Sequence, residues 1–169
     1  MELFKNVRPA APHEFNSVGK LMVSVYQQLD GFPKPVEQPA YYEMLANVGA
    51  LTSKPGTEIF VAIENDIITG AVVYFDDMQY YGSGGTATRE KLAAGFRLLA
   101  VDPRQRGKGI GKLLTCIVLK RHAIKAIANS SSTRPGLCFQ PGRCTRHLDF
   151  KDQLILISNR ASWRYLVFG

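Results

Sequence analysis

Apolar positions along this chain follow two periods, one typical of helices and one typical of strands. Residues 12–29 carry apolar side chains at helical spacing, which predicts an amphipathic helix, and a second helix is expected over 38–48. A third helix is expected over 109–127. Short apolar runs bounded by turn residues predict strands instead, and these runs cover 3–8, 58–63, 67–75 and 94–101.

The connections complete this picture as far as residue 129. The two central strands form a predicted hairpin around Glu64-Asn65-Asp66, and loops are expected over 30–35 and 76–89. Beyond residue 129 the pattern deteriorates, and strands are expected only over 154–157 and 165–168. No repeat or linker divides the chain, so we expect one domain over 1–169, with enough chain for a sizeable core.

The segment between strand 94–101 and helix 109–127 is the most distinctive. After Asp102-Pro103 it runs Arg104-Gln105-Arg106-Gly107-Lys108-Gly109-Ile110-Gly111-Lys112. Alternate glycines allow a tight turn and leave successive N–H groups accessible, because no Cβ blocks their approach. Together with the positive end of the following helix, these amides predict a site for phosphate oxygens.

Other glycine loops match this segment poorly. A dinucleotide-binding fingerprint needs G-x-G-x-x-G and an acidic residue about 20 positions later, whereas no acid follows here before Asp149. In a P-loop, Gly107 and Gly111 would be one residue too close, and Leu113 occupies the position of the magnesium-binding hydroxyl. The segment could also be a tight turn without a binding role, but such a turn would not require the cations Arg104, Arg106, Lys108 and Lys112 around it.

Charge and composition narrow the function classes. The net charge is +7, and residues 104–147 hold ten Lys or Arg and no acid, which favours an anionic cofactor with several phosphates or nucleic acid. Nucleic acid is disfavoured because aromatic residues are not interleaved with the charges. No segment is long enough to span a membrane, and the N-terminus lacks a signal pattern, so a cytoplasmic location is expected. Cys138, Cys144 and His147 lack the paired spacing of a zinc site.

Arg104 to Gly109 matches the Q/R-x-x-G-x-G/A signature of the GNAT superfamily of N-acetyltransferases, and residues 97–103 resemble that family's central strand and its exit. The order of predicted elements over 1–115 is also similar. The resemblance implies a single-domain α/β acyl-CoA N-acyltransferase fold, with a mixed, largely antiparallel sheet flanked by helices. It also implies acetyl-CoA as co-substrate, no metal, and a small-molecule or peptide amine as acceptor. A second copy of the chain, forming a homodimer, is a further possible partner.

The same resemblance implies the residues that bind acetyl-CoA. Backbone amides around Arg106 to Gly111 would hold the pyrophosphate, and the end of the central strand would pair along the pantetheine arm. The neutral amine would then attack the thioester directly, without a covalent enzyme intermediate. The expected cofactor-binding residues are Leu99, Ala100, Val101, Arg104, Gln105, Arg106, Gly107, Lys108, Gly109, Ile110, Gly111 and Lys112.

The catalytic residues stay unassigned. The central strand offers Arg97 but no carboxylate, and Glu90, Asp76 and Asp77 are weak candidates for a general base in a polar loop. Many family members carry a tyrosine acid after the fourth helix, in a segment similar to Met-Tyr-Glu-x-Leu-Gly-Phe. No such segment exists in this chain.

The missing segment suggests a reading-frame change. Codons permitted by the residues from Ser130 onward can be chosen so that a shifted frame encodes a family-like C-terminal third, including the tyrosine segment. We therefore hypothesise that residues after about Thr115 derive from a shifted frame, leaving a family-like part over 1–115 and an atypical tail over 116–169. The alternatives to an active N-acetyltransferase are an inactive or CoA-binding-only remnant of that family, and a basic nucleic-acid-binding module.

Overall fold

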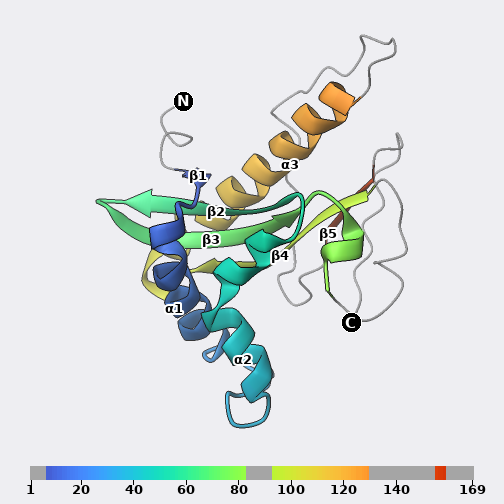
Figure 1. Cartoon of the computed structure of the whole chain (residues 1–169). Coiled ribbons are helices and arrows are strands. Elements are labelled where there is room, and N and C mark those ends of the chain that lie inside the picture. The colour runs from blue at the N-terminus through green and yellow to red at the C-terminus, as the bar shows by residue number, and fades with distance from the viewer. Residues whose placement is uncertain (1–6, 83–92, 130–154, 159–169) are drawn as a thin grey trace.

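The computed structural model describes residues 7–82, 93–129 and 155–158, whose strands form one sheet (Figure 1). Every described pair of neighbouring strands is antiparallel, in the order β1-β2-β3-β4-β5. The expected α/β fold with a largely antiparallel sheet is thus confirmed. The strands are β1 (Val7–Pro9), β2 (Thr57–Glu64), β3 (Ile67–Phe75), β4 (Ala93–Val101) and β5 (Ile155–Ser158).

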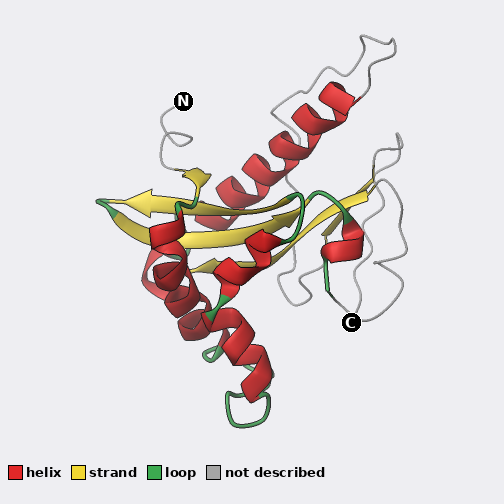
Figure 2. Cartoon of the chain, viewed as in Figure 1, coloured by secondary structure: helices red, strands yellow, loops and turns green. Residues whose placement is uncertain are grey.

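Helices cover both faces of this sheet (Figure 2). The predicted helix over 12–29 begins as a 3₁₀ turn, η2 (Pro12–Glu14), and continues as α1 (Phe15–Tyr26). The predicted second helix is α2 (Pro39–Ala46), and the third is α3 (Ile110–Asn129). Three further 3₁₀ turns connect these elements: η3 (Val48–Ser53), η4 (Met78–Tyr80) and η6 (Pro103–Gln105). The strand predicted over 165–168 and the second half of the loop over 76–89 (83–89) lie outside the described residues.

The β2–β3 hairpin forms where the sequence predicts it. Glu64 pairs with Ile67, and the two residues between them, Asn65 and Asp66, have φ angles of 50° and 62°. Positive φ at both central positions is typical of a type I′ turn, whose twist matches that of the flanking strands. Asn and Asp tolerate this conformation better than other residues with a Cβ, so the local sequence explains the turn.

The strands of the hairpin separate two hydrophobic cores because their side chains alternate between the faces. Ile59 and Val61 pack against α1 and α2, whereas Phe60 and Ala62 pack on the other face with Leu114 of α3. In Figure 1, α1 accordingly lies in front of the sheet with α2 below it, and α3 lies behind the sheet. Strand β3 repeats the same alternation, so both faces are closed by apolar contact.

Strand β4 breaks this alternation at Leu98. Phe96 packs on the α3 face, but Leu98 and Ala100 pack on the opposite face. Leu98 has a φ of 58°, and the register with β3 shifts between Ala71 and Val73. An extra residue in one strand of an antiparallel pair is a β-bulge. The bulge therefore changes the face to which the final residues of β4 point.

The C-terminal half of α3 is held on the sheet by charged contacts. Arg121 donates to both carboxylate oxygens of Glu58 in β2, at 2.7 to 3.1 Å. Lys125 lies 3.0 Å from Asp76, just after β3, and 3.5 Å from Glu58. These four residues, together with buried Val118, fix the helix at the end distant from its N-terminal loop.

Candidate functional site

The chain leaves β4 through a turn that Asp102 stabilises. Its carboxylate accepts hydrogen bonds from the backbone N–H of Arg104 at 2.9 Å and from the Arg104 guanidinium at 2.9 and 3.2 Å. These bonds hold the pKa of Asp102 below its usual value, the guanidinium contributing most. The carboxylate thus caps η6 as an anion and fixes the direction in which the glycine loop departs.

Gly107 and Gly109 both require the absence of a side chain. Each has a φ of +80°, and a Cβ built at either position would meet no atom within 4 Å. The backbone conformation, rather than crowding, therefore demands glycine, and the surrounding space is open. An approaching ligand can reach the amides of this segment directly.

The loop leads straight into the first turn of α3. The Leu113 N–H donates to the Gly109 carbonyl at 3.0 Å, so Leu113 is the first residue whose amide is bonded in helical fashion to the loop. The amides before it belong to the helix N-terminus, where N–H groups have no acceptor within the helix. They carry the positive end of the helix dipole and suit an anionic ligand.

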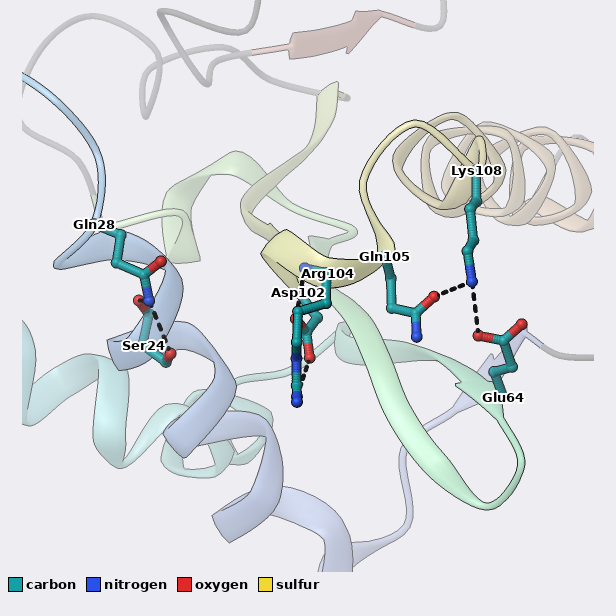
Figure 3. A network of polar contacts seen from close by, with 7 residues as sticks. All are labelled: Ser24, Gln28, Glu64, Asp102, Arg104, Gln105 and Lys108. Carbon is teal, nitrogen blue, oxygen red and sulfur yellow. Dashed lines mark hydrogen bonds and ion pairs between the residues drawn. The ribbon is translucent and has the colours of Figure 1, made fainter.

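The four loop cations differ in their partners. Lys108 lies between the Gln105 amide oxygen and the Glu64 carboxylate of the hairpin, 3.5 Å from the latter (Figure 3). Arg104 is bound to Asp102 in the same view. Arg106 and Lys112 are exposed and form no salt bridge within the described residues. These two side chains are therefore the cations most accessible to phosphate groups.

A glycine in β3 sets the position of the start of α3 relative to the sheet. A Cβ at Gly70 would lie 2.8 Å from Cγ2 of Ile110 and 3.0 Å from Cδ1 of Leu114. The first turn of α3 thus rests directly on the β3 backbone. Because Gly70 also pairs with Val101 of β4, the end of the strand and the beginning of the helix are positioned by one residue.

The predicted cofactor residues on β4 lie immediately before this turn. Ala100 pairs with Ala71, and Val101 pairs with Gly70, so one edge of β4 is occupied by β3. Leu99 is buried on the α3 face. Residues 99–112 consequently form one continuous path from the strand end through the loop to the helix, although their pairing with a pantetheine arm stays a prediction.

The candidate general bases have structural partners or lie outside the described residues. Asp76 binds Lys125 and accepts a hydrogen bond from the Tyr74 hydroxyl at 3.1 Å. Asp77 caps η4 by accepting the Gln79 N–H at 2.9 Å. Glu90 lies outside the described residues, as do Cys138, Cys144 and His147. In the described part of the chain, no three metal-binding side chains gather, and no helix has the length and hydropathy needed to cross a membrane.

The sequence did not reveal two features of this region. The pairing of Lys108 with Glu64 joins residues far apart in the chain, and no local pattern signals it. The bulge at Leu98 was also missed because leucine rarely adopts positive φ. One sequence signal could have indicated the bulge: Leu98 and Leu99 are consecutive apolar residues, and in the structure they are buried on opposite faces of the sheet.

An antiparallel sheet with helices on both faces, and an open amide loop between its fourth strand and the following helix, agrees with the acyl-CoA N-acyltransferase fold expected from the sequence. Residues 22–127 match the model of the acetyltransferase (GNAT) family. Because the match covers more than half of the chain, this protein belongs to that family, whose members are N-acetyltransferases. The match also continues beyond residue 115, where the family-like part was expected to end.

Solved structures share the fold at low identity. A GNAT acetyltransferase from Staphylococcus aureus Mu50 has a TM-score of 0.51 and 17% identity, covering 72% of this chain and 68% of its own. A Brucella melitensis GNAT acetyltransferase in complex with acetyl-CoA has a TM-score of 0.51 and 16% identity, and the match covers 70% of this chain and 68% of that protein. A GCN5-related N-acetyltransferase from Ralstonia eutropha JMP134 has a TM-score of 0.51 and 13% identity, and the match covers 80% of this chain and 96% of that protein. No curated protein sequence matches significantly.

Proposed function

We propose that this chain transfers an acetyl group from acetyl-CoA to a primary amine by direct attack on the thioester. One observation carries the proposal: Gly107 and Gly109 hold an open loop of amides at the N-terminus of α3, where a pyrophosphate would be bound. Arg106 and Lys112 would add positive charge beside it. This arrangement supports a CoA ester as the donor rather than a small uncharged acyl donor.

The chemistry requires few protein groups. The lone pair of a neutral amine forms the C–N bond, the C–S bond breaks, the nitrogen loses one proton to give the amide, and the departing CoA thiolate takes up one proton. Leu99 to Val101 would align the pantetheine arm and present the thioester at the end of β4. Proximity and orientation of the two substrates supply much of the rate acceleration in such a reaction. No described carboxylate is assigned as the base.

Matched glycine variants test the site. Gly109→Ala places a methyl group on a backbone with φ of +80°, whereas Gly31→Ala does so at φ of 72° between α1 and α2; neither methyl group would meet an atom within 4 Å. The backbone strain is therefore similar, and only the first variant alters the amide loop. We expect calorimetry to show weakened CoA binding in Gly109→Ala alone. Equal affinity in both variants would refute the assignment of the loop.

A second candidate, a remnant that binds CoA without turnover, is favoured by the absence of the tyrosine segment from the sequence after residue 115. A thiol-release assay with acetyl-CoA and a panel of amines separates this remnant from an active enzyme, because a remnant binds CoA in calorimetry and releases no thiol.

The hypothesis of a reading-frame change has its own test. Sequencing the gene through the Thr115 codon decides it, since an unbroken frame encoding this tail contradicts a frame change. A nucleic-acid-binding module would instead bind DNA or RNA in a strongly salt-dependent manner.

A further inference from the structure

Arg97 occupies a notable position on β4. It follows Phe96, the last residue of β4 in the described pairing with β5, and it precedes the bulge at Leu98. Its Nη1 donates to the Tyr81 carbonyl oxygen at 2.8 Å, and its guanidinium carbon lies 5.4 Å from the centroid of the Tyr81 ring. Tyr81 belongs to the core under α1 and α2, so Arg97 lies on that face of the sheet.

A second cation lies close to Arg97. A Cβ built at Gly82 would be 3.8 Å from Nη1 of Arg97 and 3.7 Å from Nζ of Lys54, at the end of η3. The two nitrogen atoms are therefore no further apart than the sum of these distances. Gly82 itself is exposed, so the space between the two cations opens to solvent. Neither cation forms a salt bridge within the described part of the chain.

Aromatic rings border these charges. Tyr41 of α2 is half-buried near Arg97, and its ring centroid lies 5.6 Å from that of Phe32. Burial raises the pKa of Tyr41 while Arg97 opposes that shift, which places the guanidinium within electrostatic reach of the phenol. We call Arg97, Lys54, Tyr41 and Tyr81 the Arg97 patch.

The patch has an electrostatic imbalance that an anion would correct. Arg97 and Lys54 carry like charges that both lie within 4 Å of a Cβ built at Gly82, and like charges this near one another repel, most strongly where the surroundings are partly dehydrated. Arg97 has five N–H donors in a planar fork; Nη1 donates to the Tyr81 carbonyl oxygen and the guanidinium also has a hydrogen bond with Tyr41, so these two bonds do not use all of its donors. Guanidinium donors match the two oxygens of a carboxylate or a phosphate.

We propose that the Arg97 patch binds an acidic group, carboxylate or phosphate, on the acceptor amine. The proposal rests on the proposed acetyl transfer, because it places the acceptor beside the middle of β4, the strand whose last residues would align the pantetheine arm. Arg97 is only two residues from Leu99, so the acidic group and the reacting nitrogen must be close in the acceptor. Amino acids, short peptides with a free acid group and small phosphorylated amines have this chemistry.

Matched substrates test the proposal. Acetylation rates are compared for an amino acid and its amide, and for phosphoethanolamine and ethanolamine, so that the two pairs distinguish carboxylate from phosphate. We expect the acid of at least one pair to be preferred. Arg97→Gln should raise KM for that acid by about ten- to hundredfold, since hydrogen bonds to charged groups contribute at this level. The kcat/KM of its neutral analogue should fall by a smaller factor than that of the acid, because the neutral substrate lacks the group that Arg97 would bind.

Two further variants separate a binding role from a structural one. Lys54→Gln should shift the preference in the same direction by a smaller factor, and it removes no described hydrogen bond. Lys20→Gln removes one charge from the exposed surface of α1 and should leave all four substrates unaffected. Wild-type protein that prefers neither acid, or an Arg97→Gln variant that loses acid and neutral substrates equally, would overturn the proposal.

Failure of the proposed function is distinguishable from failure of this inference. If no amine is acetylated although CoA binds, acetyl transfer is refuted for this chain. Calorimetry of the same acids with the CoA-bound protein then tests the patch alone. Binding to wild-type protein that is lost in Arg97→Gln supports the patch, whereas equal binding to both proteins, or to neither, contradicts it.

Discussion

The positive φ of Leu98 leads to an unusual prediction: replacing alanine by glycine at this position should not lower the stability of the fold. In a regular strand, glycine is less favourable than alanine by about 0.5–1 kcal/mol, because glycine loses more conformational freedom on folding. At φ of 58° a residue with a Cβ instead pays about 1–2 kcal/mol that glycine does not. At this position the strain exceeds the ordinary cost of glycine.

Two variants of Leu98 measure this strain. The side chain is only 2% exposed, so its truncation to alanine removes contacts in the core under α1 and α2 and costs about 2–5 kcal/mol. Leu98→Gly loses the same contacts and also relieves the backbone. We therefore expect Leu98→Gly to be at least as stable as Leu98→Ala, although both are less stable than wild-type protein.

Ala100 supplies the control on the same strand and the same face. It is 1% exposed and is not among the residues with positive φ, so Ala100→Gly should lower the free energy of unfolding by about 1 kcal/mol. Equilibrium urea unfolding measures all three variants, with sucrose added equally to each to keep weak variants folded. If exchanging alanine for glycine costs as much at position 98 as at position 100, the bulge stores no strain and the reasoning is wrong.

Three further predictions concern the loop and the pH dependence. Gly70→Ala would place a methyl group 2.8 Å from an isoleucine of α3, so it should lower the free energy of unfolding by about 1–3 kcal/mol and weaken CoA binding in calorimetry. The control is Gly49→Ala, whose methyl group would meet a side chain of α1 at 2.6 Å. This variant should be less stable but bind CoA as well as the wild-type protein does. Glu64→Gln should release the loop lysine and strengthen CoA binding by roughly two- to threefold at low salt, with no difference in 1 M NaCl. Hydrogen bonds from Arg8 lower the pKa of Glu14 from 4.5 to about 2, so this pair stabilises the fold above pH 4.5 and the contribution is lost as the pH falls towards 2. Arg8→Gln should flatten that acid limb in thermal unfolding, and an unchanged limb would exclude the pair as its cause.

Local sequence patterns predicted most of the described fold because the forces that form those elements are local. The helical spacing of α1, the alternation in β2 and β3, and the Asn65-Asp66 turn each depend on residues within a few positions. The glycine loop is also local, since two glycines and nearby cations follow one another in the chain. The boundary of α1 was less accurate: it ends at Tyr26, whose ring meets Phe32 edge-on at 5.3 Å as the chain turns back.

The features that were missed depend on contacts between distant segments. Arg97 was noted only as a residue where a carboxylate was expected, and its neighbours Tyr81 and Lys54 come from other elements. The anchoring of α3 through Arg121 and Glu58 joins residues 63 positions apart. Charge patterns along the chain cannot show which cations already have an anionic partner. The sequence therefore predicted the glycine loop but not the two cations of the Arg97 patch.

The charges along α3 have a kinetic consequence. Arg121 and Lys125 are neutralised by acids of the sheet, whereas Arg106 and Lys112 at the other end of the helix form no salt bridge with a described residue. Exposed Lys120 in the middle of α3 also forms no salt bridge with a described residue, so unpaired positive charge extends along the helix, and the helix dipole adds to it at the N-terminus. We expect this positive charge to attract a ligand that carries several phosphates, so that its association rate rises as ionic strength falls. The helix would then guide the encounter before any contact forms.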